Sequence, residues 1–353
     1  MKIMLLNDTA SVPHVGCQAV SDAHARMLGE AGHAVIERFF LGELRPFAIA
    51  DNDEKGAIER VLADDDLRQS LERCDAVVVN GEGTLHHGSG TEYFAVLGAA
   101  QHLGKASLIV NAVFEAHQGW ADVLSKLDDF CVRDARSREC AERAGFQCRV
   151  LPDSLLAAQF DVTPYIDLTD KVVVSDWHPA RDHDVGETMR GILRGLPDAF
   201  YFPLLHGIHA HTWRGAIAVW AKAAWIITAR HHGVYMAALA GKPFVALPSN
   251  TLKIQGLLEA ADVKIPVCTT INEVIAARAY SLERPEEYQK LRDYFRSFLP
   301  LQTFSALGTG TDSGGAAVEL DRLQRQLSGR SNSGSPKYWG LGNGDPAQLR
   351  SLG

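Results

Sequence analysis

The sequence predicts an α/β fold in which two doubly wound, Rossmann-like domains face a cleft. Short runs rich in Val, Ile and Leu alternate with helix-length amphipathic segments. The apolar runs do not alternate with polar residues, and this is typical of strands buried on both faces of a parallel sheet. The pattern then restarts after the stretch 151–170, which carries two prolines and several acids. Two successive βα units of similar size therefore predict two domains, with ligands bound at the carboxyl ends of the strands.

In the first half, the apolar runs predict strands at Lys2–Asn7, Ala34–Phe39, Ala76–Asn80, Ser107–Asn111, Phe130–Arg133 and Cys148–Leu151. The amphipathic segments between them predict helices at Gln18–Ala31, Glu54–Arg73, Tyr93–Leu103 and Ala135–Ala144. Turn-forming residues follow the strand ends, as at Asn7-Asp8 and Asn80-Gly81.

In the second half, strands are predicted at Lys171–Ser175, Phe200–Pro203, Trp225–Thr228 and Pro243–Leu247. Helices are predicted at Val185–Leu196, Trp213–Ala224, Val234–Ala240, Leu252–Ala260 and Pro285–Phe298. We therefore expect an N-terminal domain over 1–155, a C-terminal domain over 170–300 and a C-terminal segment over 301–353. The end of that segment is rich in Gly, Ser and Pro and predicts a flexible tail, in which Tyr338 and Trp339 could dock.

Composition excludes several classes of protein. Hydrophobic residues make up 46% and charged residues 22% of the 353 residues, which excludes a mainly disordered chain. A net charge of −8 argues against broad nucleic-acid binding. The sequence holds no apolar run long enough to span a membrane, and its N-terminus resembles a first strand rather than a signal peptide. We therefore expect a cytoplasmic protein, with the inner face of the cell membrane as an alternative location.

The six cysteines are Cys17, Cys74, Cys131, Cys140, Cys148 and Cys268, and none forms a C-x-x-C pair. Several stand inside apolar runs, so we expect small buried hydrophobic residues rather than disulfides or zinc ligands.

The strongest chemical motif is the trio Arg230, His231 and His232, which follows a predicted strand at the start of a helix of small residues. Free N–H groups and the helix dipole favour an anion at that position. An arginine can bind a carboxylate or phosphate through two parallel hydrogen bonds, and a histidine can transfer a proton near neutral pH. Lys253 follows the next strand and is expected to face the same cleft. The alternative is an ordinary helix start with solvated charges.

A second motif is the loop Gly81-Glu82-Gly83-Thr84 after the strand Ala76–Asn80. The glycines allow close approach of a ligand to the backbone, and Glu82 could act as an acid or a base. The spacing matches neither a dinucleotide fingerprint nor a P-loop.

Further polar residues follow other strands. Arg133 could reach the cleft, whereas Asp134 is equally well explained as a helix N-cap and Asp153 is similarly ambiguous. His178 follows the first strand of the second half, where a loop that faces phosphate is plausible. His206, His209 and His211 are close in sequence, but no carboxylate stands at a diagnostic offset, so we predict no metal.

Together these segments resemble the polysaccharide pyruvyl transferase family. The matching segments are Gly81-Glu82-Gly83-Thr84-Leu85, Arg133-Asp134-x-x-Ser137, and Arg230-x-His232 with Pro243 and Lys253. They agree with the family in order and spacing from residue 76 to about 260. The sequence departs from the family pattern at Glu82, where the middle glycine is expected, and at Pro13-His14-Val15-Gly16-Cys17, where a Gly-Asn-rich loop is expected.

The resemblance implies a GT-B-like fold and transfer of a pyruvyl group from phosphoenolpyruvate onto a sugar of a cell-surface glycan, such as a capsule or exopolysaccharide. It places the acceptor and the Gly-rich loop in the first domain and the anionic donor in the second. Arg133, Arg230 and Lys253 suit a donor with a carboxylate and a phosphate, with His231, Gly81, Gly83, Thr84 and His178 as further substrate-binding residues. His232 and Glu82 are the candidate acid and base, with Arg230 as a third catalytic candidate. No cofactor or metal is expected.

Two other functions stay open. A GT-B glycosyltransferase that uses a CMP- or UDP-sugar would have the same cleft, with Glu82 as the base for the acceptor hydroxyl and Arg230, His232 and His178 holding the donor phosphate. A non-catalytic saccharide-binding protein is the third. We expect an anionic small-molecule donor and a saccharide or lipid-linked glycan acceptor as partners, no nucleic acid, and peripheral membrane association as an option.

Overall fold

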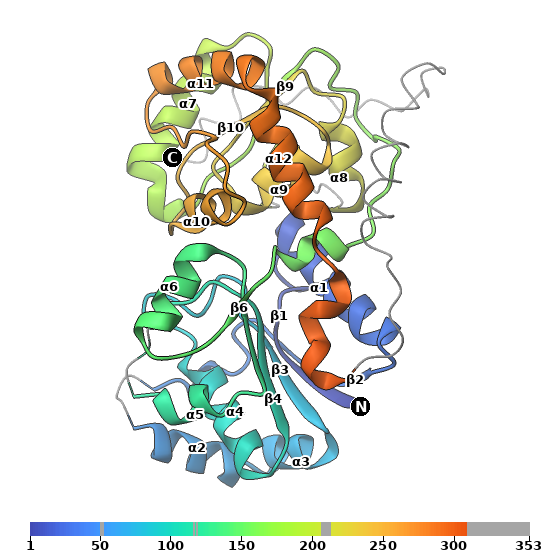
Figure 1. Cartoon of the computed structure of the whole chain (residues 1–353), viewed down its shortest axis with the longest axis vertical. Helices are drawn as coiled ribbons and strands as arrows, with labels where there is room; N and C mark the ends of the chain where they lie inside the picture. The colour runs from blue at the N-terminus through green and yellow to red at the C-terminus, as the bar shows by residue number, and fades with distance from the viewer. Residues whose placement is uncertain (50–52, 116, 118, 206–212, 309–353) are drawn as a thin grey trace.

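The computed structural model describes residues 1–49, 53–115, 117, 119–205 and 213–308, and its framework is two parallel sheets (Figure 1). The first sheet has the order β2-β1-β3-β4-β5-β6 and every neighbouring pair is parallel. Its strands are β1 (Lys2–Asp8), β2 (Ala34–Phe40), β3 (Ala76–Asn80), β4 (Ala106–Ala112), β5 (Asp129–Val132) and β6 (Arg149–Val150).

The second sheet is also parallel throughout and has the order β10-β9-β7-β8. Its strands are β7 (Val172–Val174), β8 (Ala199–Tyr201), β9 (Trp225–Thr228) and β10 (Phe244–Ala246). The first sheet lies in the lower half of Figure 1 and the second in the upper half. The predicted α/β class with two Rossmann-like halves is therefore confirmed, and every predicted strand is present with small shifts at its ends.

The helices of the first half are α1 (Val15–Glu30), α2 (Glu54–Ala63), α3 (Asp65–Arg73), α4 (Thr91–His102), α5 (Ala121–Ser125) and α6 (Ala135–Arg143). Those of the second half are α7 (Glu187–Gly195), α8 (Trp213–Trp220), α9 (His231–Leu239), α10 (Lys253–Ala260), α11 (Ile271–Glu283) and α12 (Pro285–Arg296). Shorter helical turns are η1 (Arg45–Phe47), η2 (Ser154–Ala157), η3 (Pro179–Arg181), the π-helical η4 (Asp182–Gly186) and η5 (Pro300–Leu307). Within the described residues, no helix combines the length and the apolar character needed to cross a bilayer.

Alternate side chains of the central strands enter different cores, as expected for strands covered on both faces. Ile3 and Leu5 of β1 belong to the core that contains α1, whereas Met4 and Leu6 belong to the core under α4. The core around α1 continues without a break into α8, α9 and β9 of the second half. One apolar core therefore joins the two sheets. This core fixes how the carboxyl ends of their strands are placed relative to one another.

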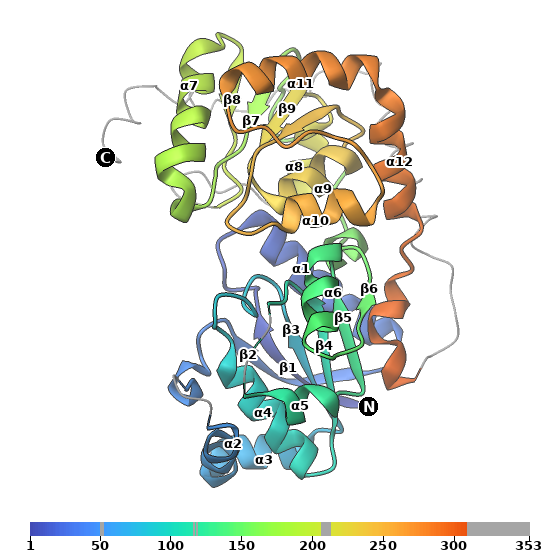
Figure 2. The same ribbon diagram turned by 60° about the vertical axis from the view of Figure 1, so that its left-hand side comes forward.

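The chain crosses back to the first half at η5, where the described residues end. Helix α12 runs down the side of the second half in Figures 1 and 2, and η5 then packs against the first half. The ring of Phe304 in η5 lies 5.6 Å from the ring of His24 in α1, and Arg149 Nη2 donates to the carbonyl of Gln302 at 2.9 Å. The two halves are also tied together by the ion pair of Arg136 with Glu259 at 2.6 Å.

One predicted helix was wrong, and two helices, α5 and α11, were not predicted. The predicted helix Glu54–Arg73 is two helices, because Asp64 ends α2 with an extended backbone and its side chain accepts the amide of Leu67 to begin α3. Helix α11 was not predicted at all, although Thr270 and Glu273 form a capping box at its start. The domain limits 1–155, 170–300 and 301–353 remain predictions, and the predicted flexible tail with Tyr338 and Trp339 lies outside the described residues.

Candidate active site

Charged and polar side chains from both sheets converge where the carboxyl ends of the strands meet the starts of four helices. Their backbone positions follow β1, β3, β5, β6, β7, β9 and β10, and precede or begin α1, α6, α9 and α10. We call this group the interdomain cluster; it consists of Thr9, Cys17, Glu82, Arg133, Asp153, Asp176, Arg230, His231, His232 and Lys253. Helix N-termini that converge in this way favour a negatively charged ligand.

Arg133 and Asp153 form the buried centre of the cluster. Their side chains are 1% and 0% exposed and make a close ion pair. The backbone N–H of Asp153 donates to the hydroxyl of Tyr235 at 2.9 Å, and its Oδ1 accepts the amide of Leu155 at 2.9 Å. Burial alone would raise the pKa of Asp153, but Arg133 and His232 hold that pKa well below its ordinary value. Asp153 is therefore a permanent anion that holds Arg133 in place.

The two histidines at the start of α9 lie close to the same carboxylate, that of Asp153. Nε2 of His231 lies 3.5 Å from Asp153 Oδ2, and Nε2 of His232 lies 3.3 Å from it. Burial, with Arg133 next in importance, lowers the pKa of His231 to about 3. His231 is therefore neutral near pH 7, and it supplies hydrogen-bonding atoms rather than charge.

Glu82 stands opposite the histidines, on the side of the first sheet. Its Oε2 accepts a hydrogen bond from the hydroxyl of Thr9 at 3.1 Å, and its Oε1 accepts one from the thiol of Cys17 at 3.1 Å. Nε2 of His232 lies 3.3 Å from the same Oε1. The predicted base and the predicted acid, from different halves of the chain, are thus within proton-transfer distance of one another.

The lack of a side chain at Gly16 allows the imidazole of His232 to come close to the start of α1. A Cβ at Gly16 would lie 2.1 Å from Cγ and Nδ1 of His232, so any larger residue would displace the imidazole. The neighbouring His14 caps α1, because its Nδ1 accepts the amides of Gly16 at 3.0 Å and Cys17 at 3.4 Å. The loop that departs from the expected Gly-Asn-rich pattern therefore forms one wall of the cluster.

Arg230 lies at the rim of the cluster, on the side of the second sheet. Its Nε donates to Asp176 Oδ2 at 2.9 Å, and its Nη2 binds the same carboxylate and the carbonyl of Trp177 at 2.8 Å. Oδ1 of Asp176 accepts the amide of Leu204 at 2.8 Å. Nη1 of Arg230 has no hydrogen bond to any described residue, so one side of the guanidinium can still bind a ligand.

Lys253 begins α10 and makes no ion pair with the described residues. Burial, followed by the charges of Arg133 and Arg230, lowers the pKa of Lys253 to about 7. The pKa of His178 is lowered by burial and by Arg230, and its Nδ1 accepts the amide of Ala180 at 3.2 Å. An anion that binds among these groups would restore the positive charge of Lys253.

The glycine-rich loop has mostly structural contacts. A Cβ at Gly81 would lie 2.5 Å from Cβ of Ala112, and Gly83 has a φ of +63° that favours glycine. The hydroxyl of Thr84 accepts a hydrogen bond from Asn7 Nδ2 at 2.8 Å. Substrate binding by Gly81, Gly83 and Thr84 remains a prediction, whereas these contacts explain how Glu82 is positioned.

Several buried polar atoms of the cluster have no hydrogen-bond partner among the described residues: Arg133 Nε, His231 Nδ1 and Nε2, and His232 Nε2. A buried donor or acceptor without a partner costs about 1–3 kcal/mol. Such a concentration at one place is the property of a binding site whose ligand supplies the missing partners.

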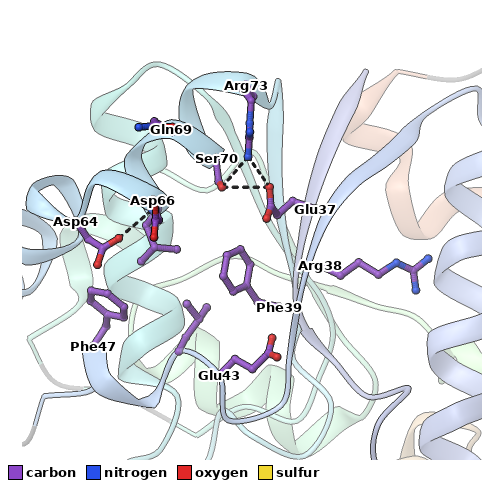
Figure 3. A pocket seen from close by; sticks show the side chains of 12 residues that line it. Glu37, Arg38, Phe39, Glu43, Phe47, Asp64, Asp66, Gln69, Ser70 and Arg73 are labelled. Carbon is purple, nitrogen blue, oxygen red and sulfur yellow. Dashed lines mark hydrogen bonds and ion pairs between the residues drawn. The ribbon is translucent and has the colours of Figure 1, made fainter.

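Two other places were considered as sites. His206, His209 and His211 lie outside the described residues. A cavity of about 670 Å³ opens between β2, η1 and α3, as Figure 3 shows, with Phe39 and Phe47 in it and the Arg73–Glu37 ion pair at 2.9 Å on its edge. No residue of the interdomain cluster lines that cavity.

The sequence did not point to Thr9, Cys17 or Asp176. All six cysteines are free, as expected, but Cys17 is only half-buried and faces Glu82. Asp176 directly follows the predicted strand Lys171–Ser175, so its place at a strand end could have been recognised from the sequence. Asp134, the other ambiguous acid, is a helix cap: its Oδ1 accepts the amide of Ser137 at 2.8 Å.

The family model described as "Polysaccharide pyruvyl transferase" matches residues 16–251. No curated protein matches the chain.

Solved structures with the same overall fold are enzymes of the GT-B type. S. aureus MnaA in complex with UDP has a TM-score of 0.54 at 14% identity, over 96% of this chain and 100% of that one. The UDP-GlcNAc 2-epimerase from Neisseria meningitidis has a TM-score of 0.51 at 14% identity, over 92% and 100%. Spinosyn forosaminyltransferase SpnP has a TM-score of 0.51 at 14% identity, over 93% and 99%. Similarity at this level of identity shows the fold alone.

Proposed function

The chain belongs to the polysaccharide pyruvyl transferase family, and we propose that it transfers a pyruvyl group from phosphoenolpyruvate onto a sugar of a cell-surface glycan. The observation that carries the proposal is the set of buried atoms of Arg133, His231 and His232 that have no hydrogen bond to the described residues, beside Lys253, which makes no ion pair with them. A small donor with a carboxylate and a phosphate can satisfy these groups within a small volume. The acceptor is a saccharide or lipid-linked glycan, which would bring a cytoplasmic enzyme to the inner face of the membrane.

The chemistry needs one proton donor and one proton acceptor. Protonation of the methylene carbon of phosphoenolpyruvate makes the adjacent carbon electrophilic. One sugar hydroxyl adds to that carbon and loses its proton, and the second displaces phosphate to close the ketal. Of the two hydroxyl protons, one replaces the proton given to the methylene carbon and the other leaves with phosphate.

Glu82 and His232 fit these two roles. Glu82 accepts hydrogen bonds from Thr9 and Cys17, which fix its carboxylate for removing a hydroxyl proton. His232 lies 3.3 Å from Glu82 and delivers a proton to the methylene carbon. Glu82 can then reprotonate it. Arg133, Arg230 and Lys253 hold the donor and stabilise the departing phosphate. No metal or cofactor takes part in the proposed reaction.

A donor screen tests the proposal. Phosphoenolpyruvate should raise the melting temperature of the protein and release phosphate in the presence of a panel of glycan acceptors. Stabilisation by a CMP- or UDP-sugar, with nucleotide release and no effect of phosphoenolpyruvate, would replace pyruvyl transfer with glycosyl transfer. Binding of glycans with no donor effect would favour a non-catalytic protein.

A further inference from the structure

Cys17 Sγ and His232 Nε2 both approach Oε1 of Glu82 in the interdomain cluster, and we call these three atoms the triangle. Cys17 Sγ lies 3.1 Å from Glu82 Oε1, and His232 Nε2 lies 3.3 Å from that same oxygen. His14, Cys17 and His232 each place one possible ligand atom within 4.8 Å of the other two. The triangle joins the start of α1, the loop after β3 and the start of α9, so it draws on both halves of the chain.

These distances suit a zinc-like cation. Zinc binds sulfur at about 2.3 Å and nitrogen or oxygen at about 2.0–2.2 Å, so in a tetrahedral site a sulfur stands about 3.5–3.7 Å from a neighbouring oxygen, and a nitrogen stands about 3.3–3.5 Å from one. The separation of His232 Nε2 from Glu82 Oε1 matches that spacing, and the sulfur of Cys17 would move about half an ångström away from Glu82 to take its place around the cation. Thiolate and imidazole ligands select zinc and similar metals over magnesium and calcium, which prefer oxygen.

His232 provides an independent observation. Its side chain is 7% exposed, and Nε2 is buried without a hydrogen bond to any described residue. That nitrogen nevertheless lies 3.3 Å from each of two carboxylates, those of Glu82 and Asp153. A buried nitrogen aimed between two carboxylates marks a position for a proton or for a metal cation.

The cap at the start of α1 limits which atoms can bind metal. Nδ1 of His14 already accepts the amides of Gly16 and Cys17, so its ring is held as the helix cap. The structure therefore assigns Cys17, Glu82 and His232 as the ligands, with water at the fourth position. Metal binding replaces the thiol proton of Cys17, which is released to solvent as the sulfur–metal bond forms.

We propose that this triangle binds one zinc-class divalent cation, and that the bound cation inhibits pyruvyl transfer. The inhibition rests on the proposed function: a ligated Glu82 cannot remove a proton, and a ligated His232 cannot deliver one. The thiolate and Glu82 balance the two charges of the cation. Lys253 and the N-termini of α1 and α9 oppose it, so the site should bind more weakly than a structural zinc site and release zinc to a chelator.

Cobalt is the direct probe of the site, because a thiolate bound to Co²⁺ gives a charge-transfer absorption. Chelator-treated full-length protein should bind one Co²⁺ per chain with that absorption, and Zn²⁺ should displace it. Cys17→Ser should abolish the band, whereas the matched Cys140→Ser, which alters another half-buried cysteine, should keep it. No band, or the same band in Cys17→Ser, would overturn the site.

Two further variants keep the result interpretable. Glu82→Gln retains every cysteine and should weaken Co²⁺ binding at least tenfold, even if Cys17→Ser fails to fold. His14→Asn should keep the helix cap and keep the band, because Asn caps helices as well as any residue. Loss of the band in His14→Asn, with the fold intact, would overturn the assignment of ligands.

Activity is a separate readout. Zn²⁺ should stop phosphate release from phosphoenolpyruvate, and a chelator should restore it. Zinc binding at Cys17 with unchanged turnover would overturn the inhibition. Zinc binding in a protein that uses no phosphoenolpyruvate would refute the proposed function and the inhibition that rests on it, but would support the metal site.

Discussion

The two arginine–aspartate pairs of the interdomain cluster look alike in sequence but differ in their surroundings. Arg133 and Asp153 are 1% and 0% exposed and stand at the ends of β5 and β6 in the first sheet. Arg230 and Asp176 are 11% and 8% exposed and follow β9 and β7 in the second. Both arginines were predicted to hold the donor, yet each already has an aspartate partner.

This difference in burial indicates which arginine can leave its aspartate to bind a ligand. The pair at Arg133 lies beside Tyr235 and the two histidines and is almost fully buried, so removing one partner leaves a buried charge without its main partner. The pair at Arg230 lies nearer solvent, and Nη1 of Arg230 has no hydrogen bond within the described part of the chain. We therefore expect Arg133 to matter first for folding, and Arg230 to matter first for donor binding.

Arg133→Met is expected to have the largest effect, and it tests whether the buried pair stabilises the fold. It leaves Asp153 buried without its main partner, and breaking a buried ion pair in this way costs about 3–5 kcal/mol. Urea unfolding should show that loss, and Arg133→Met/Asp153→Leu should recover much of it. An Arg133→Met protein as stable as the wild type would show that the buried pair does not stabilise the fold.

Glu82→Gln tests the chemistry on the side of the first sheet. The amide keeps the volume of the side chain but cannot take a proton, so turnover should fall by about 10²–10⁴-fold while donor affinity is retained. Donor affinity and turnover should be measured on the same preparation. Retained turnover would remove Glu82 from the mechanism, and lost donor binding would give it a structural role instead.

Arg230→Ala tests the side of the second sheet. Loss of a charge-assisted contact to the donor should weaken donor binding by about 2–5 kcal/mol and abolish measurable turnover. Its unfolding midpoint should stay close to that of the wild type, unlike that of Arg133→Met. The matched control Arg136→Ala removes a surface cation that pairs with Glu259, and it should bind donor normally. Normal donor affinity in Arg230→Ala would contradict the claim that Arg230 matters first for donor binding.

Lys253→Arg has the smallest expected effect and concerns pH. The pKa of Lys253 is lowered to about 7, so the lysine is charged below pH 7 and loses its charge as the pH rises. Donor affinity of the wild type should therefore fall above pH 7, by at most about tenfold per pH unit. Arginine keeps its charge, so Lys253→Arg should show little change over the same range. Parallel pH dependence in both proteins would exclude Lys253 as the cause.

Much of this arrangement could be predicted because parallel strands place their carboxyl ends at one edge of a sheet. Arg133, Glu82, Arg230, His232 and Lys253 all follow recognisable strands, and the structure brings them together. The partners of the arginines could not be predicted, because Asp153 and Asp176 are far away in sequence and their pairing depends on sheet order.

Other features were missed for different physical reasons. The contact of Glu82 with His232 crosses the two halves, so it depends on how the sheets are oriented by the shared core and not on either local pattern. Cys17 was grouped with cysteines in apolar runs, although its position beside Gly16 at a helix start places it in the cluster. Helix α11 was missed although its capping residues, Thr270 and Glu273, were readable in the sequence.

The most direct test of the account follows the proton given to the donor. The full-length protein, phosphoenolpyruvate and the glycan panel are incubated in deuterated water, and the products are analysed by mass spectrometry and NMR. We predict phosphate release together with a pyruvyl ketal that carries one deuterium in its methyl group, and loss of both in Glu82→Gln. A ketal without deuterium, or no ketal and no phosphate with any acceptor, would contradict protonation of phosphoenolpyruvate by this site.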